Sequence, residues 1–68
     1  MTYYTLAVRH GGTYDPEFGD YDQETVVAEA EEYLQQYPEL DETDIAVLET
    51  SGDQKDIDAE IARINVLT

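Results

Sequence analysis

The chain has 68 residues and carries 17 aspartates and glutamates against three lysines and arginines, a formal net charge of −14. A chain of this length forms one small domain, residues 1–68, with a core that is barely large enough to fold. The absence of cysteine excludes disulfides, thiolate zinc sites and cysteine nucleophiles.

No apolar run approaches the ~20 residues of a membrane span, and no signal peptide is visible. We therefore expect a cytoplasmic protein. Phosphate backbones and anionic lipids repel such an acidic chain, so we expect no direct binding to nucleic acid or to membranes.

Residues 2–9 alternate in the manner of a half-buried strand, with many aromatic and β-branched side chains. One face carries Tyr4, Leu6 and Val8, and the other carries Tyr3, Thr5, Ala7 and Arg9. The glycines at 11 and 12 predict a hairpin.

The register of this hairpin depends on the length of its loop. A two-residue loop would place Asp15 and Glu17 opposite Val8 and Leu6. A three-residue loop over 10–12 would place Tyr14 and Pro16 there instead, and because a one-residue slip moves every side chain to the other face, we expect this second register. Proline lacks an N–H group, so the second strand is predicted to lie at an edge.

The clearest helix follows the hairpin. Asp22 is a good N-cap, and Pro38 predicts an end near Tyr37. Apolar side chains recur on one side at helical spacing: Val26, Val27, Ala30, Tyr33, Leu34 and Tyr37. The opposite side is acidic.

Residues 45–50 form a third predicted strand that is apolar on both faces and therefore substantially buried. Asp53 can cap a second helix, whose core stripe is Ile57, Ile61 and Ile64. Residues 65–68 could be helix, strand or tail.

The order β-β-α-β-α places the third strand antiparallel to the first and beside it. We predict an α+β, two-layer domain with a three-stranded antiparallel sheet in the order 2-1-3 and both helices on one face. The other face would then present Tyr3, Thr5, Ala7 and Arg9 to solvent or to a partner.

Catalytic motifs are not visible. The single histidine, His10, is placed at a hairpin tip, and the chain has no phosphate-binding or nucleophile motif. We expect no enzyme activity, no catalytic residue and no cofactor. Five acids lie within residues 15–24, but their spacing does not match a calcium loop, so no metal site is predicted.

The acidic surface is the main candidate for function. We predict a partner-binding site formed by Asp20, Asp22, Glu24, Glu29, Glu31 and Glu32, with contact area from Tyr3, Tyr14 and Tyr21, since tyrosine is enriched at interfaces. A parallel row on the second helix, Asp53, Asp56, Asp58 and Glu60, could join the first row on one face. Two such rows could imitate phosphates and occupy a basic nucleic-acid channel.

The junction at residues 16–22, Pro-Glu-Phe-Gly-Asp-Tyr-Asp, resembles that of small uncharacterised phage and prophage proteins. In these proteins a tyrosine-rich first strand leads to a similar junction, and the resemblance covers residues 3–33. It implies a small accessory protein of mobile genetic origin, often an antagonist of host defence or of a host enzyme, and hence a place in the host cytoplasm. It implies no catalytic residues.

Two hypotheses of function remain open at this point. The first is a phage-type inhibitor whose acidic face docks on a basic, nucleic-acid-binding protein. The second is a structural or accessory domain whose acidity reflects solubility or adaptation to high salt, and which could form homodimers.

Overall fold

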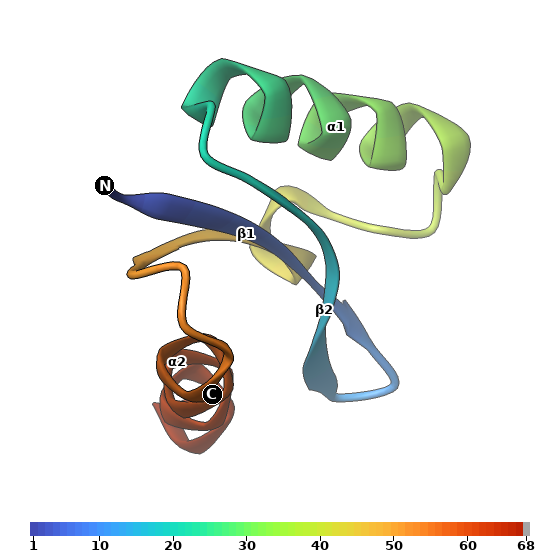
Figure 1. Cartoon of the computed structure of the whole chain (residues 1–68). Coiled ribbons are helices and arrows are strands. Elements are labelled where there is room, and N and C mark those ends of the chain that lie inside the picture. Colours follow the sequence, from blue (N-terminus) through green and yellow to red (C-terminus); the bar gives the residue numbers. More distant parts are fainter. Residues whose placement is uncertain (68) are drawn as a thin grey trace.

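The structure is a computed structural model that describes residues 1–67. Its elements follow the predicted order (Figure 1): β1 (Tyr3–His10), β2 (Thr13–Asp20), α1 (Gln23–Gln36), the 3-10 turn η1 (Glu42–Asp44), β3 (Ile45–Thr50) and α2 (Gln54–Leu67). Both strand pairs are antiparallel and the sheet order is β2-β1-β3. The predicted α+β class and strand order are therefore confirmed.

The two helices lie on opposite faces of the sheet, which corrects the predicted two-layer arrangement. Figure 1 shows the sheet between α1 and α2. On one face, Val26 and Ala30 of α1 pack with Leu6 and Val8. On the other face, α2 covers three buried side chains with two of its isoleucines: Ala7, Tyr14 and Leu48 lie beneath Ile61 and Ile64.

The reason for this arrangement lies in the strands. Ala7 is fully buried and pairs with Ala46, while Thr5 pairs with Leu48. Both pairs lie on the face that was expected to be open. Leaving that face uncovered would expose this apolar surface to water, so the second helix crosses to it.

The hairpin has the two-residue loop, so the expected register is wrong at its start. Gly11 and Gly12 both have positive φ, 63° and 105°, as tight hairpin turns require. Val8 therefore pairs with Asp15. A β-bulge between Leu6 and Ala7 then shifts the register by one residue, so that Leu6 pairs with Phe18 instead of the expected Pro16.

The helix ends agree with the sequence signals. The Asp22 side chain accepts a hydrogen bond from the Glu24 N–H, and the helix ends with Tyr37 as its C-cap. At the second helix, the Asp53 carboxylate accepts from the Lys55 N–H at 3.1 Å. Residues 65–67 form the last turn of α2, and residue 68 lies outside the described residues.

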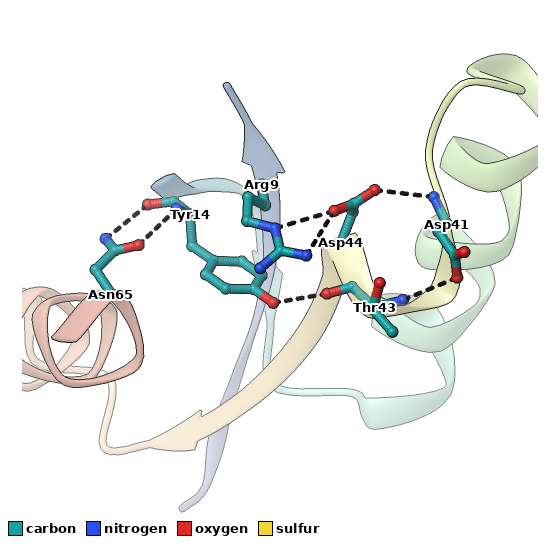
Figure 2. A network of polar contacts seen from close by, with 6 residues as sticks. All are labelled: Arg9, Tyr14, Asp41, Thr43, Asp44 and Asn65. Carbon is teal, nitrogen blue, oxygen red and sulfur yellow. Dashed lines mark hydrogen bonds and ion pairs between the residues drawn. The ribbon is translucent and has the colours of Figure 1, made fainter. Parts of the chain in front are cut away.

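Two side-chain contacts fasten the layers together (Figure 2). The Arg9 guanidinium donates to the Asp44 carboxylate, with an Nη2–Oδ1 distance of 2.9 Å, and its centre lies 5.3 Å from the Tyr14 ring centroid. Asn65 accepts from the Tyr14 N–H at 2.6 Å and donates to the Tyr14 carbonyl at 3.1 Å. The end of α2 is thereby attached to the outer edge of β2.

Candidate functional site

The outward side of α1 is a row of unpaired carboxylates. Val26 and Ala30 face the sheet, so the helical period turns Glu24, Glu31 and Glu32 toward solvent, where all three are exposed. Among residues 1–67, none of these three carboxylates accepts a hydrogen bond or forms an ion pair. We call this surface, Glu24, Glu31 and Glu32 with Glu29 at its flank, the α1 face.

Positive charge lies on the other side of the sheet. The chain has no lysine, arginine or histidine between residues 11 and 54, a stretch that holds 14 of the 17 acids. Arg9 is engaged by Asp44. The two remaining basic residues, Lys55 and Arg63, lie on α2, where Arg63 donates to Glu60 at 2.7 Å. The α1 face therefore has no cation within its own helix to neutralise it.

These carboxylates do not stabilise their own helix. Glu29 and Glu32 are spaced i, i+3 and repel each other, and the last turn of α1 has no basic residue to interact with the helix dipole. Only Glu24, in the first turn, is electrostatically favourable for the helix. Glu29, Glu31 and Glu32 therefore add negative charge to the protein surface without stabilising the helix.

Two of the predicted site residues, Asp20 and Asp22, have structural roles. The Asp20 carboxylate accepts from the Asp22 N–H at 2.8 Å. The Asp22 carboxylate accepts from the Glu24 N–H at 3.2 Å and from the Thr25 hydroxyl at 2.9 Å. Asp20 and Asp22 therefore build the junction between β2 and α1 and contribute charge only at the end of the α1 face.

Glu29 is half-buried at the flank of the helix. Near it, the Tyr33 hydroxyl donates to the Glu17 carboxylate at 3.2 Å. Burial raises the pKa of Tyr33, and the charges of Glu17 and Glu29 raise it further. The phenol therefore stays protonated as a hydrogen-bond donor between α1 and β2.

The three tyrosines predicted to face a partner differ in position. Tyr14 is only 7 % exposed, so its predicted exposure is wrong. Its hydroxyl donates to the Thr43 carbonyl at 2.7 Å (Figure 2). The two-residue loop explains this burial, because it turns Tyr14 to the face that α2 covers.

Tyr3 and Tyr21 form one aromatic cluster at the end of the sheet. Their rings meet edge to face with centroids 4.9 Å apart. Tyr3 packs against Gly19 and Tyr21 against Gly52, so closely that a Cβ at either glycine would clash with the ring above it. Tyr3 is half-buried and Tyr21 is 50 % exposed. Tyr21 is therefore the aromatic that can contact a partner near the N-terminus of α1.

Sequence reasoning missed two exposed apolar side chains of this helix. Tyr37, expected in the core or at its edge, is 40 % exposed, and Val27 is 41 % exposed. The Tyr37 ring lies 5.4 Å from that of Tyr33, centroid to centroid. The signal for Tyr37 was its position next to Pro38, which places it at the helix C-cap, after the last residue of α1. Exposed tyrosines thus lie at both ends of α1: Tyr21 just before the helix, against Tyr3, and Tyr37 at its C-cap, beside Tyr33.

The predicted second row of carboxylates does not join the first. Asp53, Asp56, Asp58 and Glu60 lie on or beside α2, on the opposite side of the sheet (Figure 1). All four accept hydrogen bonds. Asp56 accepts from the Ser51 hydroxyl and Glu60 from Arg63. Asp53 accepts from the Lys55 N–H and Asp58 from the Gln54 amide. A single face with two parallel acidic rows is therefore excluded.

Other kinds of site find no support in the described part of the chain. Within residues 1–67, no three histidine, aspartate or glutamate side chains are grouped to hold a metal ion. His10 is exposed at the end of β1, with its Nε2 3.7 Å from the Glu17 carboxylate. None of the helices in this range is both long and apolar enough to cross a membrane.

Comparison of the chain with protein-family models, with curated protein sequences and with solved structures gave no match. Function must therefore be inferred from the geometry and charge of the chain itself.

Proposed function

We propose that the protein is a non-enzymatic binding protein whose α1 face docks on a basic surface of another protein. Charge segregation is the observation that carries this proposal. The α1 face holds unpaired carboxylates, and the three lysines and arginines lie on the far face or on α2. Tyr21 and Tyr37, which are exposed at the two ends of the helix, would add aromatic contact area.

Charge density determines what kind of basic surface fits. The four glutamates of α1 lie between residues 24 and 32, about 12 Å at about 1.5 Å per residue, or roughly one charge per 3–4 Å. Duplex DNA carries about one charge per 1.7 Å. The α1 face is too sparse to copy a duplex, so the proposal rests on complementarity to a basic surface and does not require imitation of phosphate spacing.

The resemblance of residues 16–22 to phage proteins gives the proposal its specific form, an inhibitor of a host nucleic-acid-binding protein. Such proteins present the basic surfaces that this face would complement. Long-range attraction between the two would make association fast and sensitive to salt.

Adaptation to high salt is the competing explanation, and the acids of α2 favour it because they extend the negative charge to both faces. It gives no reason for the uneven placement of the cations, however. The two explanations differ in what a single substitution should do. If the acidity is an adaptation to salt, replacing any exposed acid should have the same effect. If the α1 face docks on a partner, replacing an acid of α1 should weaken binding more than replacing an acid elsewhere.

The test is affinity capture on the immobilised protein, from a lysate of the source organism, followed by titration of the purified partner. We expect a basic partner whose affinity falls steeply as NaCl rises. The Glu31→Lys and Glu32→Lys variants should each weaken binding by about tenfold or more, because each places a cation against a basic surface.

Asp58→Lys is the matched control, since it makes the same change of charge on the far side of the sheet. It should change affinity much less than either α1 variant. An equal loss with Asp58→Lys, or binding that does not depend on salt, would reject docking by the α1 face. Competition by a duplex oligonucleotide then decides whether the partner's nucleic-acid site is the surface bound.

A further inference from the structure

The two edges of the sheet differ in how they are closed. At the outer edge of β2, the Asn65 side chain occupies both the N–H and the C=O of Tyr14. The next residue on that side, Pro16, has no N–H to offer. The bulge that follows distorts the strand further. The β2 edge is therefore protected against pairing with another strand.

The edge of β3 has none of these protections. Within residues 1–67, β3 pairs with β1 alone. It contains no proline, no lysine and no bulge. Its side chains are mostly apolar and half-buried at the start, from Ile45 to Val47, and exposed at Glu49.

The direction of the free backbone groups follows from two independent contacts. His10 and Thr13 flank a two-residue loop and so exchange hydrogen bonds, which by alternation directs Val8 toward β2. Its partner Ile45 must therefore point away from β1, and the Ile45 N–H does so by donating to the Glu42 carbonyl.

Alternation along β3 then turns Val47 and Glu49 outward as well. Their N–H and C=O groups form no hydrogen bond with any other element of the described chain. The outer edge of β3 thus presents a short ladder of unused donors and acceptors.

Acidic side chains lie beside the end of this ladder. Glu49 lines a shallow groove at the C-terminal end of β3 together with Thr50, Ser51, Asp56, Ala59 and Glu60. The Glu49 carboxylate has no partner among residues 1–67. Asp56 is held by the Ser51 hydroxyl, and Glu60 is offset by Arg63. The groove is therefore net negative and offers acceptors to a cationic side chain.

We propose that the β3 edge binds an extended, lysine- or arginine-bearing segment of a partner protein, which adds a fourth strand to the sheet. Backbone hydrogen bonds to Val47 and Glu49 would supply the pairing. Basic side chains of the segment would lie against Glu49 and the acidic groove. This surface is distinct from the α1 face, and the proposal does not depend on docking there.

A second copy of the chain is the other strand that could pair with this edge. Charge complementarity argues against it, since each copy carries a net charge of −14 and the groove beside the edge is negative in both. A basic segment is attracted by the same field that repels a second copy.

The test is an NMR titration of the isotope-labelled protein with a capped peptide, Lys-Val-Thr-Val-Thr-Val-Lys-Lys. In the free protein, we expect the Val47 and Glu49 amides to exchange quickly with solvent, whereas the Ala46 and Leu48 amides are protected. The peptide should shift the β3 signals and slow exchange at Val47 and Glu49.

Two variants at one position separate pairing from charge. Glu49→Pro removes the outward N–H without touching the ladder to β1 and should lower affinity by about tenfold or more. Glu49→Gln removes the charge but keeps the N–H and should lower it by less than about fivefold. The amide spectrum of each variant shows whether the fold is kept.

Peptide controls keep the proposal testable even if Glu49→Pro unfolds the protein. A fully N-methylated peptide of the same charge should not bind, and a version with glutamates in place of its lysines should bind at least tenfold more weakly. The proposal is overturned if the N-methylated or the acidic peptide binds as well as the original, or if the shifts map to α1. A dimer with Val47 and Glu49 already protected would overturn it in favour of a second copy.

Discussion

Asn65 uses its side chain to complete a strand, although it belongs to a helix. Its amide accepts from the N–H and donates to the C=O of Tyr14, which are two half-buried backbone groups with no other partner among the described residues. Because unsatisfied buried groups cost far more than a made hydrogen bond returns, this one side chain matters for both α2 and β2.

We predict that Asn65→Ala lowers the free energy of unfolding by about 1–3 kcal/mol. The measurement is urea denaturation followed by circular dichroism. Val66→Ala is the control, since Val66 is the next residue and is 85 % exposed, and it should change stability by less than about 0.5 kcal/mol. Equal effects of the two substitutions would mean that the contact with Tyr14 contributes nothing to stability.

For single residues, features that depend on near neighbours in the sequence were predicted more reliably than features that depend on contacts between distant residues. Asp22 was correctly predicted as a cap because its partner, the Glu24 N–H, lies two residues away. The burial of Tyr14 could not be found in the same way. It depends on the loop register and on Asn65, which lies 51 residues further along the chain.

Among the elements, α1 is a helix that is acidic beyond its first turn. Glu29 and Glu32 repel each other at i, i+3, and no basic side chain occupies the last turn. Its stability comes from packing of Val26 and Ala30 on the sheet.

We predict that Glu32→Lys raises the free energy of unfolding by about 0.5–1 kcal/mol, because it replaces a repulsive pair with an attractive one. For a domain of this size that corresponds to a few degrees in melting temperature, which thermal circular dichroism detects. Glu24→Lys is the control and should lower it, because it places a cation in the first turn. A lower melting temperature for Glu32→Lys would contradict this electrostatic description of the helix.

The same substitution connects stability with the proposed function. If Glu32→Lys stabilises the fold and yet weakens partner binding, loss of binding cannot be attributed to unfolding.

The arrangement of the elements was predictable in part. Their order, type and approximate ends follow from periodicity and capping signals, which are local. The predicted placement of α2 was wrong, although the strands indicated a second covered face. Ala46 and Leu48 lie on the face of β3 opposite to that of Ile45 and Val47, and Ala7 is apolar on the same second face of β1. A sheet with two apolar faces needs two covers.

For the whole molecule, the net charge of −14 is the dominant long-range term. Self-repulsion acts more strongly in the compact state than in the expanded unfolded chain. Raising the salt concentration from about 0.01 M to 1 M shortens the screening length from about 30 Å to about 3 Å. Salt should therefore stabilise the fold while it weakens any association with a basic partner.

We predict that the melting temperature rises with NaCl over this range. The comparison is a Glu32→Lys/Asp58→Lys variant, which carries four fewer net negative charges and should respond less to salt. A melting temperature that is flat or falls with salt would show that self-repulsion is not a major term. A chain that folds only above molar salt would instead favour adaptation to a saline cytoplasm.

The central strand of the sheet is the first to be synthesised. β1 (Tyr3–His10) can form its hairpin with β2 at once, but its other neighbour, β3 (Ile45–Thr50), follows only after the whole of α1 and the turn η1. During translation, one side of β1 is therefore an open template for strand pairing between nascent chains. The acids of β2, α1 and the following loop are synthesised in this interval, and their mutual repulsion would oppose association of neighbouring nascent chains until β3 closes the sheet.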